Sequence, residues 1–333
     1  MTPSFLIVRL GSLGDLIHTL PAVAALRRAH PDARIDWLVE APHRQLLTLV
    51  PILSNIVVLR DRSASAWMQA RRELRARRYD VALDFQGLIK SAALARLSGA
   101  RSVIGFDRAA LREPAARFFY TRTAQVGEGR HVIAKNLALV SAVLERVETA
   151  MDFPMRDIES SALDALRAQG IEKFALVNPG AAWPNKRWPA ERFGEIARAL
   201  SDTHGLTPVV LWGPGERALA ESVVTASGGA GVIAPETQLP DLVALSRAAS
   251  FMISGDTGPL HIACATGTPT VSLFGPTDAK RNGPWDARDV VLSRYDTCPC
   301  HYKRQCQQPA SWCLPEITVA QVLDAVRTRL SGH

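Results

Sequence analysis

The sequence predicts an α/β protein made of two doubly wound parallel-sheet domains. Short apolar runs alternate with longer segments in which apolar residues recur at helical spacing, and this alternation is typical of parallel strands joined by helices. The pattern runs through residues 1–150 and begins again at residue 175. The length of 333 residues also exceeds the usual size of one domain, so we expect two similar halves.

Ten apolar runs predict the strands. In the first half they lie at residues 5–10, 35–39, 55–59, 81–84 and 102–104. In the second half they lie at residues 175–177, 208–211, 232–234, 251–254 and 270–274. The spacing from Leu16 to Leu26 indicates a helix after the first strand, which Pro21 should kink or restart. We expect the connection between the halves at residues 152–171 and a closing helix at about residues 318–330.

The composition is that of an ordinary globular protein, with 47% hydrophobic and 21% charged residues. No stretch approaches the roughly 20 apolar residues that cross a bilayer. The apolar run at residues 5–8 is too short for the core of a secretory signal and is interpreted as a buried strand. These features favour a cytoplasmic protein.

The net charge of +7 is unevenly distributed along the chain. Residues 1–150 hold 22 Lys and Arg against 13 Asp and Glu, an excess of +9, whereas residues 151–333 hold 17 against 19. Such a basic half attracts nucleic acid, acidic lipid headgroups or a multiply charged substrate. The alternative is that many of these arginines are simply solvated.

The first strand leads into RLGSLGD at residues 9–15, followed by a helix. The two glycines permit close backbone approach, and a helix start favours anions. The spacing is not that of the dinucleotide-binding fingerprint, however, and the carboxylate of Asp15 would repel a phosphate. We therefore expect Asp15 to meet a proton or a hydroxyl group. The alternative, equally weighted from this turn alone, is that Asp15 merely caps the helix.

Two loops of the second half have the composition of a diphosphate site. The loop at residues 178–189 is rich in proline and glycine and carries Lys186, whose charge could neutralise a departing diphosphate. Glu216 follows the next strand and could bind a ribose diol or interact with a helix N-terminus.

The second loop, GDTGPLH at residues 255–261, opens another helix. The backbone amides of Thr257 and Gly258 could hold a diphosphate there. His261 could contact the ligand or form a core hydrogen bond.

Four cysteines crowd one short segment: Cys298, Cys300, Cys306 and Cys313. Their spacing is not a standard zinc-ligand spacing, and a reducing cytoplasm argues against permanent disulfides. A loop staple or disulfide, a metal site and reduced thiols all remain open, while Cys264 is expected to be buried.

Together these segments resemble glycosyltransferase family 9, the ADP-heptose:lipopolysaccharide heptosyltransferases. The resemblance runs from RLGSLGDLIHTLP at residues 9–21 to GDTGPLHIA at residues 255–263 and FGPTD at residues 274–278. DFQGLIKS at residues 84–91 and REP at residues 112–114 resemble enzymes that add the first heptose, to the Kdo sugar of the inner core. The loop at residues 178–189 is more similar to the second-heptose enzymes.

The resemblance implies a GT-B fold, two Rossmann-like domains facing across a cleft. Residues 1–160 would bind the acceptor and residues 170–317 the nucleotide sugar. A C-terminal helix in residues 318–333 could pack back on the N-terminal domain. The implied reaction is an inverting direct displacement that needs neither a metal nor a cofactor.

The resemblance also implies a role for each matching residue. Asp15 would be the general base and Lys186 the cation that stabilises the leaving ADP. The donor would be bound by residues of three loops: Glu216, Asp256, Thr257, Gly258 and His261. Ala181 and Ala182 stand where first-heptose enzymes carry hydroxyl residues, so no donor contact through those two side chains is expected.

The implied partners are an ADP-sugar and an anionic, lipid-linked Kdo acceptor, with no nucleic acid. Candidate acceptor-binding residues lie in the basic half: Gly14, Arg60, Arg62, Gln86, Lys90 and Arg112, with Arg101 a further cation. The basic run at residues 71–78 could touch headgroups on the inner face of the inner membrane, or it could be a solvated helix face.

Three rival interpretations remain. One is another family 9 transferase that adds a second heptose or a different sugar. Another is a GT-B-like sugar-nucleotide epimerase or hydrolase, which needs no basic acceptor face. The last is a nucleotide-binding protein without catalysis, which the presence of Asp15, Lys186 and Asp256 disfavours.

Overall fold

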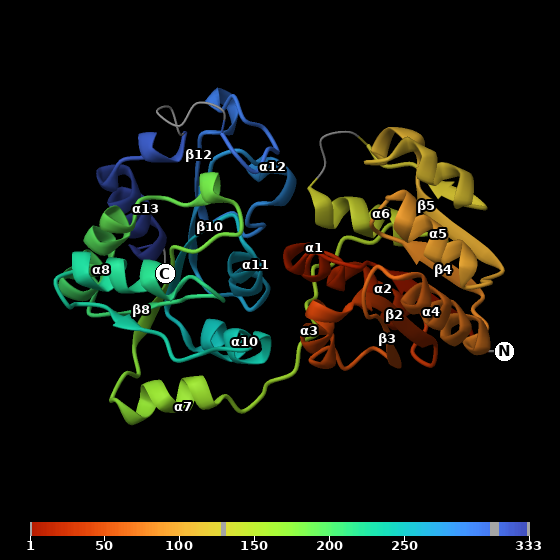
Figure 1. Ribbon diagram of the computed structural model, residues 1–333, viewed down its shortest axis with the longest axis horizontal. Coiled ribbons are helices and arrows are strands. Elements are labelled where there is room, and N and C mark those ends of the chain that lie inside the picture. The colour runs from red at the N-terminus through yellow and green to blue at the C-terminus, as the bar shows by residue number, and fades with distance from the viewer. Residues whose placement is uncertain (1, 128–130, 307–312, 332–333) are drawn as a thin grey trace. The chain divides into compact units, whose positions relative to one another are not determined.

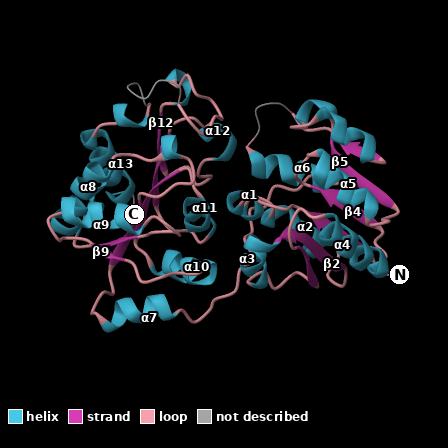
Figure 2. Cartoon of the chain, viewed as in Figure 1, coloured by secondary structure: helices cyan, strands magenta, loops and turns pink. Residues whose placement is uncertain are grey.

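The computed structural model describes residues 2–127, 131–306 and 313–331, and the chain divides into two compact units, Met1–Asp157 and Ile158–His333. Each unit is built on a six-stranded parallel sheet with helices between successive strands (Figures 1 and 2). The prediction of an α/β protein with doubly wound parallel sheets is confirmed.

The sheet of the first unit has the strand order β3-β2-β1-β4-β5-β6. All five residues of β1 are buried, and β1 lies between β2 and β4 with both neighbours parallel. The strands of this sheet are β1 (Ser4–Val8), β2 (Arg34–Glu40), β3 (Asn55–Leu59), β4 (Val81–Asp84), β5 (Ser102–Phe106) and β6 (Arg122–Ala124).

The helices of the first unit connect these strands. They are α1 (Leu13–Ile17), α2 (Leu20–Ala29), α3 (Arg44–Thr48), α4 (Ala64–Arg77), α5 (Ile89–Leu97) and α6 (Val132–Leu144), with short 3-10 turns η1 (Ala41–His43), η2 (Arg108–Ala110) and η3 (Pro114–Phe119). Pro21 lies in the first turn of α2, where a missing N–H breaks no helical hydrogen bond, so the predicted restart of the helix is confirmed. α2 packs against α6, while α4 packs against α5.

The sheet of the second unit has the strand order β12-β11-β10-β7-β8-β9. Its central strands β7 and β10 are buried along their whole length. The strands are β7 (Phe174–Asn178), β8 (Thr207–Val210), β9 (Val232–Ile233), β10 (Phe251–Gly255), β11 (Thr270–Phe274) and β12 (Val290–Ser293).

The helices of the second unit are α7 (Ser161–Ala168), α8 (Ala190–His204), α9 (Arg217–Ala226), α10 (Leu239–Ala248), α11 (Gly258–Ala265), α12 (Ala279–Asn282) and α13 (Val319–Ser331), with 3-10 turns η4 (Pro184–Lys186), η5 (Tyr295–Thr297) and η7 (Leu314–Glu316). α8 ends at His204 because Gly205 takes a left-handed conformation with φ of 62°. The apolar face of α13, with Val322 and Val326, belongs to the core of the second unit. Packing of this helix on the first unit stays a prediction.

Three elements were not predicted. β6 and β12 are edge strands. β6 contains only three residues, of which Arg122 is exposed, so it shows no strong apolar run. β12 does contain an apolar run, at residues 290–292, and this run was missed. α7 lies inside the segment expected to be a connection, and it packs against α10. Among the described residues, no helix has the length and apolar character needed to cross a membrane.

Candidate functional site

In each unit several of the predicted site residues follow the two strands at which the winding of the sheet reverses. In the first unit these strands are β1, which precedes Asp15, and β4, which precedes Gln86 and Lys90. In the second unit they are β7, which precedes Lys186, and β10, which precedes Asp256. Ligands of doubly wound sheets bind beyond the carboxyl ends of the strands at this reversal, so the topology marks both loop sets as candidate sites.

The Asp15 carboxylate is held between a buried arginine and the start of α1. Arg9 Nη2 lies 2.5 Å from Asp15 Oδ1, and the other guanidinium nitrogen donates to the carbonyl of Phe85. Asp15 Oδ2 accepts hydrogen bonds from the Ser12 N–H at 3.2 Å and the Ser12 hydroxyl at 3.1 Å. The side chain of Asp15 is 29% exposed, against 8% for Arg9.

This geometry reconciles the two interpretations of Asp15. The bond from the Ser12 N–H is the one that a residue in the first turn of a helix makes as a cap. The adjacent Arg9 cation favours the ionised carboxylate, which is the form that can accept a proton. Because the carboxylate also remains partly exposed, the capping role does not prevent contact with a ligand hydroxyl.

Sequence reasoning missed Glu40, the last residue of β2, and His43, which lies in η1 at the same edge of the sheet. The imidazole of His43 packs so closely on Gly11 that a Cβ there would lie 2.8 Å from His43 Nε2. Burial lowers the pKa of His43 below its ordinary value, although the charges of Glu40 and Asp15 oppose this shift. Their position directly after a predicted strand was the available signal, because the same rule had identified Asp15.

The structure brings two of the predicted acceptor residues close to this turn. Gln86 Oε1 accepts the N–H of Leu10 at 2.8 Å, and Lys90 Nζ lies 2.6 Å from Glu40 Oε1. The N–H of Glu40 in turn donates to the Leu10 carbonyl at 3.1 Å. Gln86, Lys90 and the Asp15 turn are therefore linked through the backbone of Leu10.

The other predicted acceptor residues lie outside these contacts. Gly14 is buried in α1, where it contributes backbone and no side chain. Arg60 and Arg62 are exposed on the loop after β3, and Arg112 is exposed just before η3. Arg101 is also exposed and pairs with Asp80 at 3.3 Å.

A buried carboxylate shapes the turn that carries Gln86. Asp84, fully buried at the end of β4, accepts hydrogen bonds from the Tyr120 hydroxyl at 2.7 Å and the Ser91 hydroxyl at 2.9 Å. It also accepts the N–H groups of Gln86 at 2.9 Å and Gly87 at 3.3 Å. Burial raises the pKa of Asp84 even though these bonds oppose the shift. Asp84 thus contributes to the site by holding the backbone of Gln86 and Gly87 in place.

In the second unit, Lys186 and Asp256 form a close ion pair. Lys186 Nζ lies 2.5 Å from Asp256 Oδ2 and also donates to the Asp256 carbonyl at 3.3 Å. The ammonium group stands 4.6 Å from the centre of the Trp183 ring, a cation–π contact. Lys186 is at the end of η4, so a short turn after β7 places its charge beside the loop that follows β10.

Asp256 is the most heavily bonded residue of the predicted donor loop. Its oxygens accept hydrogen bonds from the Thr277 hydroxyl at 2.6 Å and the Asn282 amide at 2.9 Å, and His261 Nε2 lies 3.3 Å away. Burial alone would raise the pKa of Asp256, but the hydrogen bond from His261 and the charge of Lys186 outweigh it and hold the pKa well below its usual range. Asp256 is therefore an ionised residue that orients Lys186 and His261.

Replacing Asp256 by asparagine should change how stability depends on pH. A carboxyl group with a lowered folded-state pKa contributes stability above its unfolded value, near 3.8, and loses it as the pH falls below that value. The thermal midpoint of the wild type should therefore fall steeply below about pH 4. Asp256→Asn should have a lower midpoint at neutral pH and a shallower slope in the acid range. Calorimetry between pH 3 and 7 measures both, and equal slopes would contradict the assignment.

The start of α11 is arranged around Asn178, which sequence reasoning did not single out. Asn178 Nδ2 donates to the hydroxyls of Ser254 and Thr257, each at 2.9 Å. Thr257 is the residue before α11 and has an extended backbone, and Gly258 is the first residue of the helix. The Thr257 hydroxyl is thus occupied by its hydrogen bond with Asn178. The backbone N–H groups at the start of α11 have the orientation that favours an anion.

Glu216 closes the neighbouring loop. Its Oε1 lies 3.1 Å from Arg187 Nη2, and its Oε2 accepts the N–H of Gly213 at 3.3 Å. A Cβ on Gly180 would lie only 2.2 Å from Glu216 Oε2, so this approach requires glycine at position 180. Of the two alternatives for Glu216, these contacts support a structural role at the N-terminus of α9, and its side chain keeps 19% exposure.

No disulfide bond joins the cysteines of the described residues. Cys298, Cys300 and Cys313 are buried together with Cys306 packed against them, and Cys300 Sγ donates to Cys306 Sγ at 2.7 Å. Among the residues that the structure describes, no group of His, Cys, Asp and Glu is arranged to hold a metal. The three alternatives for this cluster stay predictions. Cys264 is buried, as predicted, in a separate cluster with Leu260 and Phe274.

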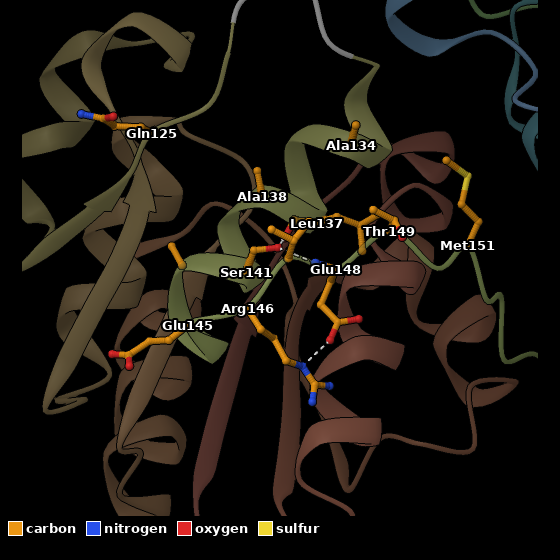
Figure 3. Close-up of a pocket in the computed structure, with 12 residues that line it drawn as sticks. Gln125, Ala134, Leu137, Ala138, Ser141, Glu145, Arg146, Glu148, Thr149 and Met151 are labelled. Atoms are coloured by element: carbon orange, nitrogen blue, oxygen red, sulfur yellow. Dashed lines mark hydrogen bonds and ion pairs between the residues drawn. The ribbon is translucent and has the colours of Figure 1, made fainter.

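A cavity of about 630 Å³ lies beside α6 in the first unit (Figure 3). Leu137 and Met151 contribute to its lining, and the Arg146 guanidinium pairs with Glu148 at 2.6 Å along one wall. None of the predicted site residues lines it. The sequence-predicted chemistry is therefore at the strand ends and not in this cavity.

Comparisons with known proteins find relatives that cover most of the chain. The family model described as glycosyltransferase family 9 (heptosyltransferase) matches residues 67–311. Lipopolysaccharide heptosyltransferase 1 of Pseudomonas aeruginosa is 31% identical over 91% of this chain and 88% of its own length. The protein of the same name from Escherichia coli K12 is 30% identical over 86% of this chain and 92% of its own.

A solved structure is similar over nearly the whole chain. The Escherichia coli heptosyltransferase WaaC, with ADP-2-deoxy-2-fluoro heptose, has a TM-score of 0.78 and 26% identity and covers 97% of this chain and 99% of its own. Similarity over both units shows the GT-B fold, with its two Rossmann-like domains, that the resemblance implied.

Proposed function

The chain belongs to glycosyltransferase family 9, the heptosyltransferases, and from that premise we propose that it transfers L-glycero-D-manno-heptose from ADP-heptose to the Kdo of the lipopolysaccharide inner core. The observation that supports this most directly is the pair of charged centres at the strand ends. One is an exposed carboxylate beside a buried arginine, Asp15 with Arg9, and the other is the cation Lys186 beside the start of α11.

In the proposed reaction, the first unit, residues 1–160, binds the acceptor and residues 170–317 bind the donor. Asp15 takes the proton of the acceptor hydroxyl as its oxygen attacks the anomeric carbon of the heptose. The bond from that carbon to the phosphate oxygen breaks, and the electron pair leaves on ADP. Displacement from the opposite face inverts the anomeric centre, and no metal takes part.

Lys186 and the start of α11 stabilise the leaving diphosphate, because charge develops there in the transition state. The amides of Thr257 and Gly258 would meet the phosphates. Asp256 and His261 would act mainly by positioning Lys186, since Asp256 already bonds four side chains. Glu216 would contact the nucleotide only through the part of its carboxylate that remains exposed.

We place this activity on the cytoplasmic face of the inner membrane, in peripheral contact with it. A lipid-linked Kdo acceptor carries carboxylates and phosphates, which the basic first half would attract. Three acceptor candidates are close to Asp15: Gly14 is its neighbour in the chain, and Gln86 and Lys90 are linked to its turn through the backbone of Leu10. The outer acidic groups of the acceptor would be bound by Arg60, Arg62 and Arg112.

The test is to incubate the enzyme with ADP-heptose and a series of truncated core acceptors, following ADP release and acceptor mass. We expect one heptose to be added to a Kdo-terminated acceptor and no addition to one that already carries the first heptose. Preference for the heptose-terminated acceptor would reassign the enzyme to the second transfer. Absence of ADP release with every Kdo- or heptose-terminated acceptor would refute the proposal.

A further inference from the structure

Nearly all of the basic charge of the first unit comes from one continuous segment. Residues 60–122 hold 14 Lys and Arg against 6 Asp and Glu, an excess of +8. Residues 1–150 as a whole have an excess of +9, so the rest of that half is almost neutral. The segment contains α4, α5, η2 and η3.

The acidic residues of this segment are committed to local contacts, whereas most of the arginines are exposed. Glu73 pairs with Arg77 at 3.2 Å, Asp80 pairs with Arg101, and Asp84 is buried. The remaining three acidic residues each accept a hydrogen bond from a backbone N–H group; they are Asp61, Asp107 and Glu113. Twelve arginines between residues 60 and 122 are exposed, so the outer surface of these elements has a strong positive charge.

Large apolar side chains are exposed among these arginines. Phe118, in η3, is 89% exposed, and Arg117 beside it is also exposed. Ile89 and Leu97, at the two ends of α5, are 43% and 38% exposed, and Met68 of α4 is 52% exposed. A phenylalanine left almost wholly in water has no role in the core of its own unit, and exposed apolar groups among cations are typical of membrane-surface segments.

The elements that carry these side chains are connected. α5 packs against both α4 and η3 (Figure 1). The N–H of Ile89 donates to Glu113 Oε2 at 2.7 Å, and the N–H of Glu113 donates to the Gly87 carbonyl at 3.4 Å. These bonds tie the beginning of η3 to the beginning of α5. We call α4, α5 and η3 with their exposed side chains the basic–apolar face.

We propose that the basic–apolar face docks the enzyme on an anionic lipid bilayer, with Phe118 inserted between headgroups and the surrounding arginines against lipid phosphates. This inference rests on the proposed function, which requires an acceptor held in a bilayer. Charge complementarity selects the partner, because an excess of +8 suits a surface of anionic lipids. The face also adjoins the acceptor candidates: Lys90 is next to Ile89, and Arg112 lies two residues before η3.

The test measures binding of the full chain to sucrose-loaded vesicles by sedimentation. The vesicles contain phosphatidylcholine alone or phosphatidylcholine with phosphatidylglycerol. The wild type should sediment with the anionic vesicles and much less with the neutral ones, and added salt should release it. Phe118→Ser should weaken binding to anionic vesicles about tenfold, the loss expected for withdrawing one aromatic side chain from apolar contact. Arg117→Glu should weaken it by about fivefold or more.

Two variants serve as matched controls. Val147 is 85% exposed in the same unit but lies after α6, outside the basic–apolar face, so Val147→Ser should bind like the wild type. Arg327 is an exposed arginine of α13 in the second unit, and Arg327→Glu should also leave binding unchanged. Equal losses in Phe118→Ser and Val147→Ser, or in Arg117→Glu and Arg327→Glu, would overturn the assignment of the face.

Further outcomes separate this inference from the proposed function. Transfer to a lipid-free Kdo acceptor should be unchanged in Phe118→Ser, because that acceptor needs no bilayer, and this also shows that the variant is folded. Transfer by a wild type that does not bind anionic vesicles would overturn the docking inference and leave the function intact. Vesicle binding with no transfer to any acceptor would refute the function alone. A wild-type dimer that Phe118→Ser converts to a monomer would overturn docking and assign the face to a second copy of the chain.

Discussion

Replacing Asp15 by asparagine is expected to reduce heptose transfer by about 10²–10⁴-fold while donor binding remains unchanged. A positioned carboxylate base contributes a factor of this size when it takes a proton in the transition state. Asparagine keeps the size of the side chain and can still accept from Ser12, but it cannot take the proton. The measurements are kcat with a Kdo-terminated acceptor and ADP affinity by calorimetry.

The control for Asp15→Asn is Ser12→Ala. This variant removes the hydroxyl that lies 3.1 Å from Asp15 Oδ2 and leaves both the carboxylate and Arg9 in place. It should therefore lose far less activity than Asp15→Asn. The thermal midpoints show whether either variant fails because the helix start is disturbed. Turnover by a folded Asp15→Asn enzyme at nearly the wild-type rate would show that Asp15 is only a cap.

Replacing Lys186 by alanine should lower kcat about 10²–10³-fold, the effect of removing one preorganised group that stabilises transition-state charge. The loss should appear in donor parameters, because Lys186 lies beside the start of α11, and the KM for acceptor should change little. Steady-state kinetics with each substrate varied in turn, and calorimetric titration with ADP, measure these effects.

Two features of Lys186 determine how this experiment is controlled. Its partner Asp256 is 6% exposed, and removing one member of a buried ion pair typically costs about 3–5 kcal/mol of stability, so the unfolding midpoint of Lys186→Ala is needed beside its rate. Lys173 is an exposed lysine just before β7, at the opposite end of the strand, and Lys173→Ala should be silent. A rise in acceptor KM with normal ADP binding in Lys186→Ala would reverse the assignment.

The central strands were predictable because they are buried on both faces and therefore read as continuous apolar runs. β4 and β11 have the bounds that the sequence predicts, and β1 and β10 differ by one or two residues at their ends. The edge strand β3 also has its predicted bounds, because its sequence NIVVL is an apolar run although it is only partly buried. β6 was not predictable in this way, since an edge strand of three residues with an exposed arginine carries little apolar pattern. Helix α7 was missed because Pro154 and Gly170 made residues 152–171 resemble a connection. The residues between them nevertheless form a helix that packs against α10.

The sequence predicted those candidate site residues that lie in a loop directly after a strongly apolar strand. Asp15, Lys186 and Asp256 all follow such strands, and the rule that ligands lie at strand ends was enough to select them. Glu40, His43 and Asn178 also lie at strand ends, but they were not singled out, because the sequence does not show what they contact. His43 packs on Gly11, and Asn178 bonds Thr257, across separations of 32 and 79 residues.

The sequence by itself therefore determined the two parallel sheets and the loops at their strand ends, because apolar periodicity and turn residues are local properties. The tertiary structure decided how the charged side chains in those loops are paired. It placed Arg9 against Asp15, Lys186 against Asp256 and the core face of α13 within the second unit. The pairing of Lys186 with Asp256 depends on β7 and β10 becoming neighbours in the sheet, and that order arises only when the strands pack together.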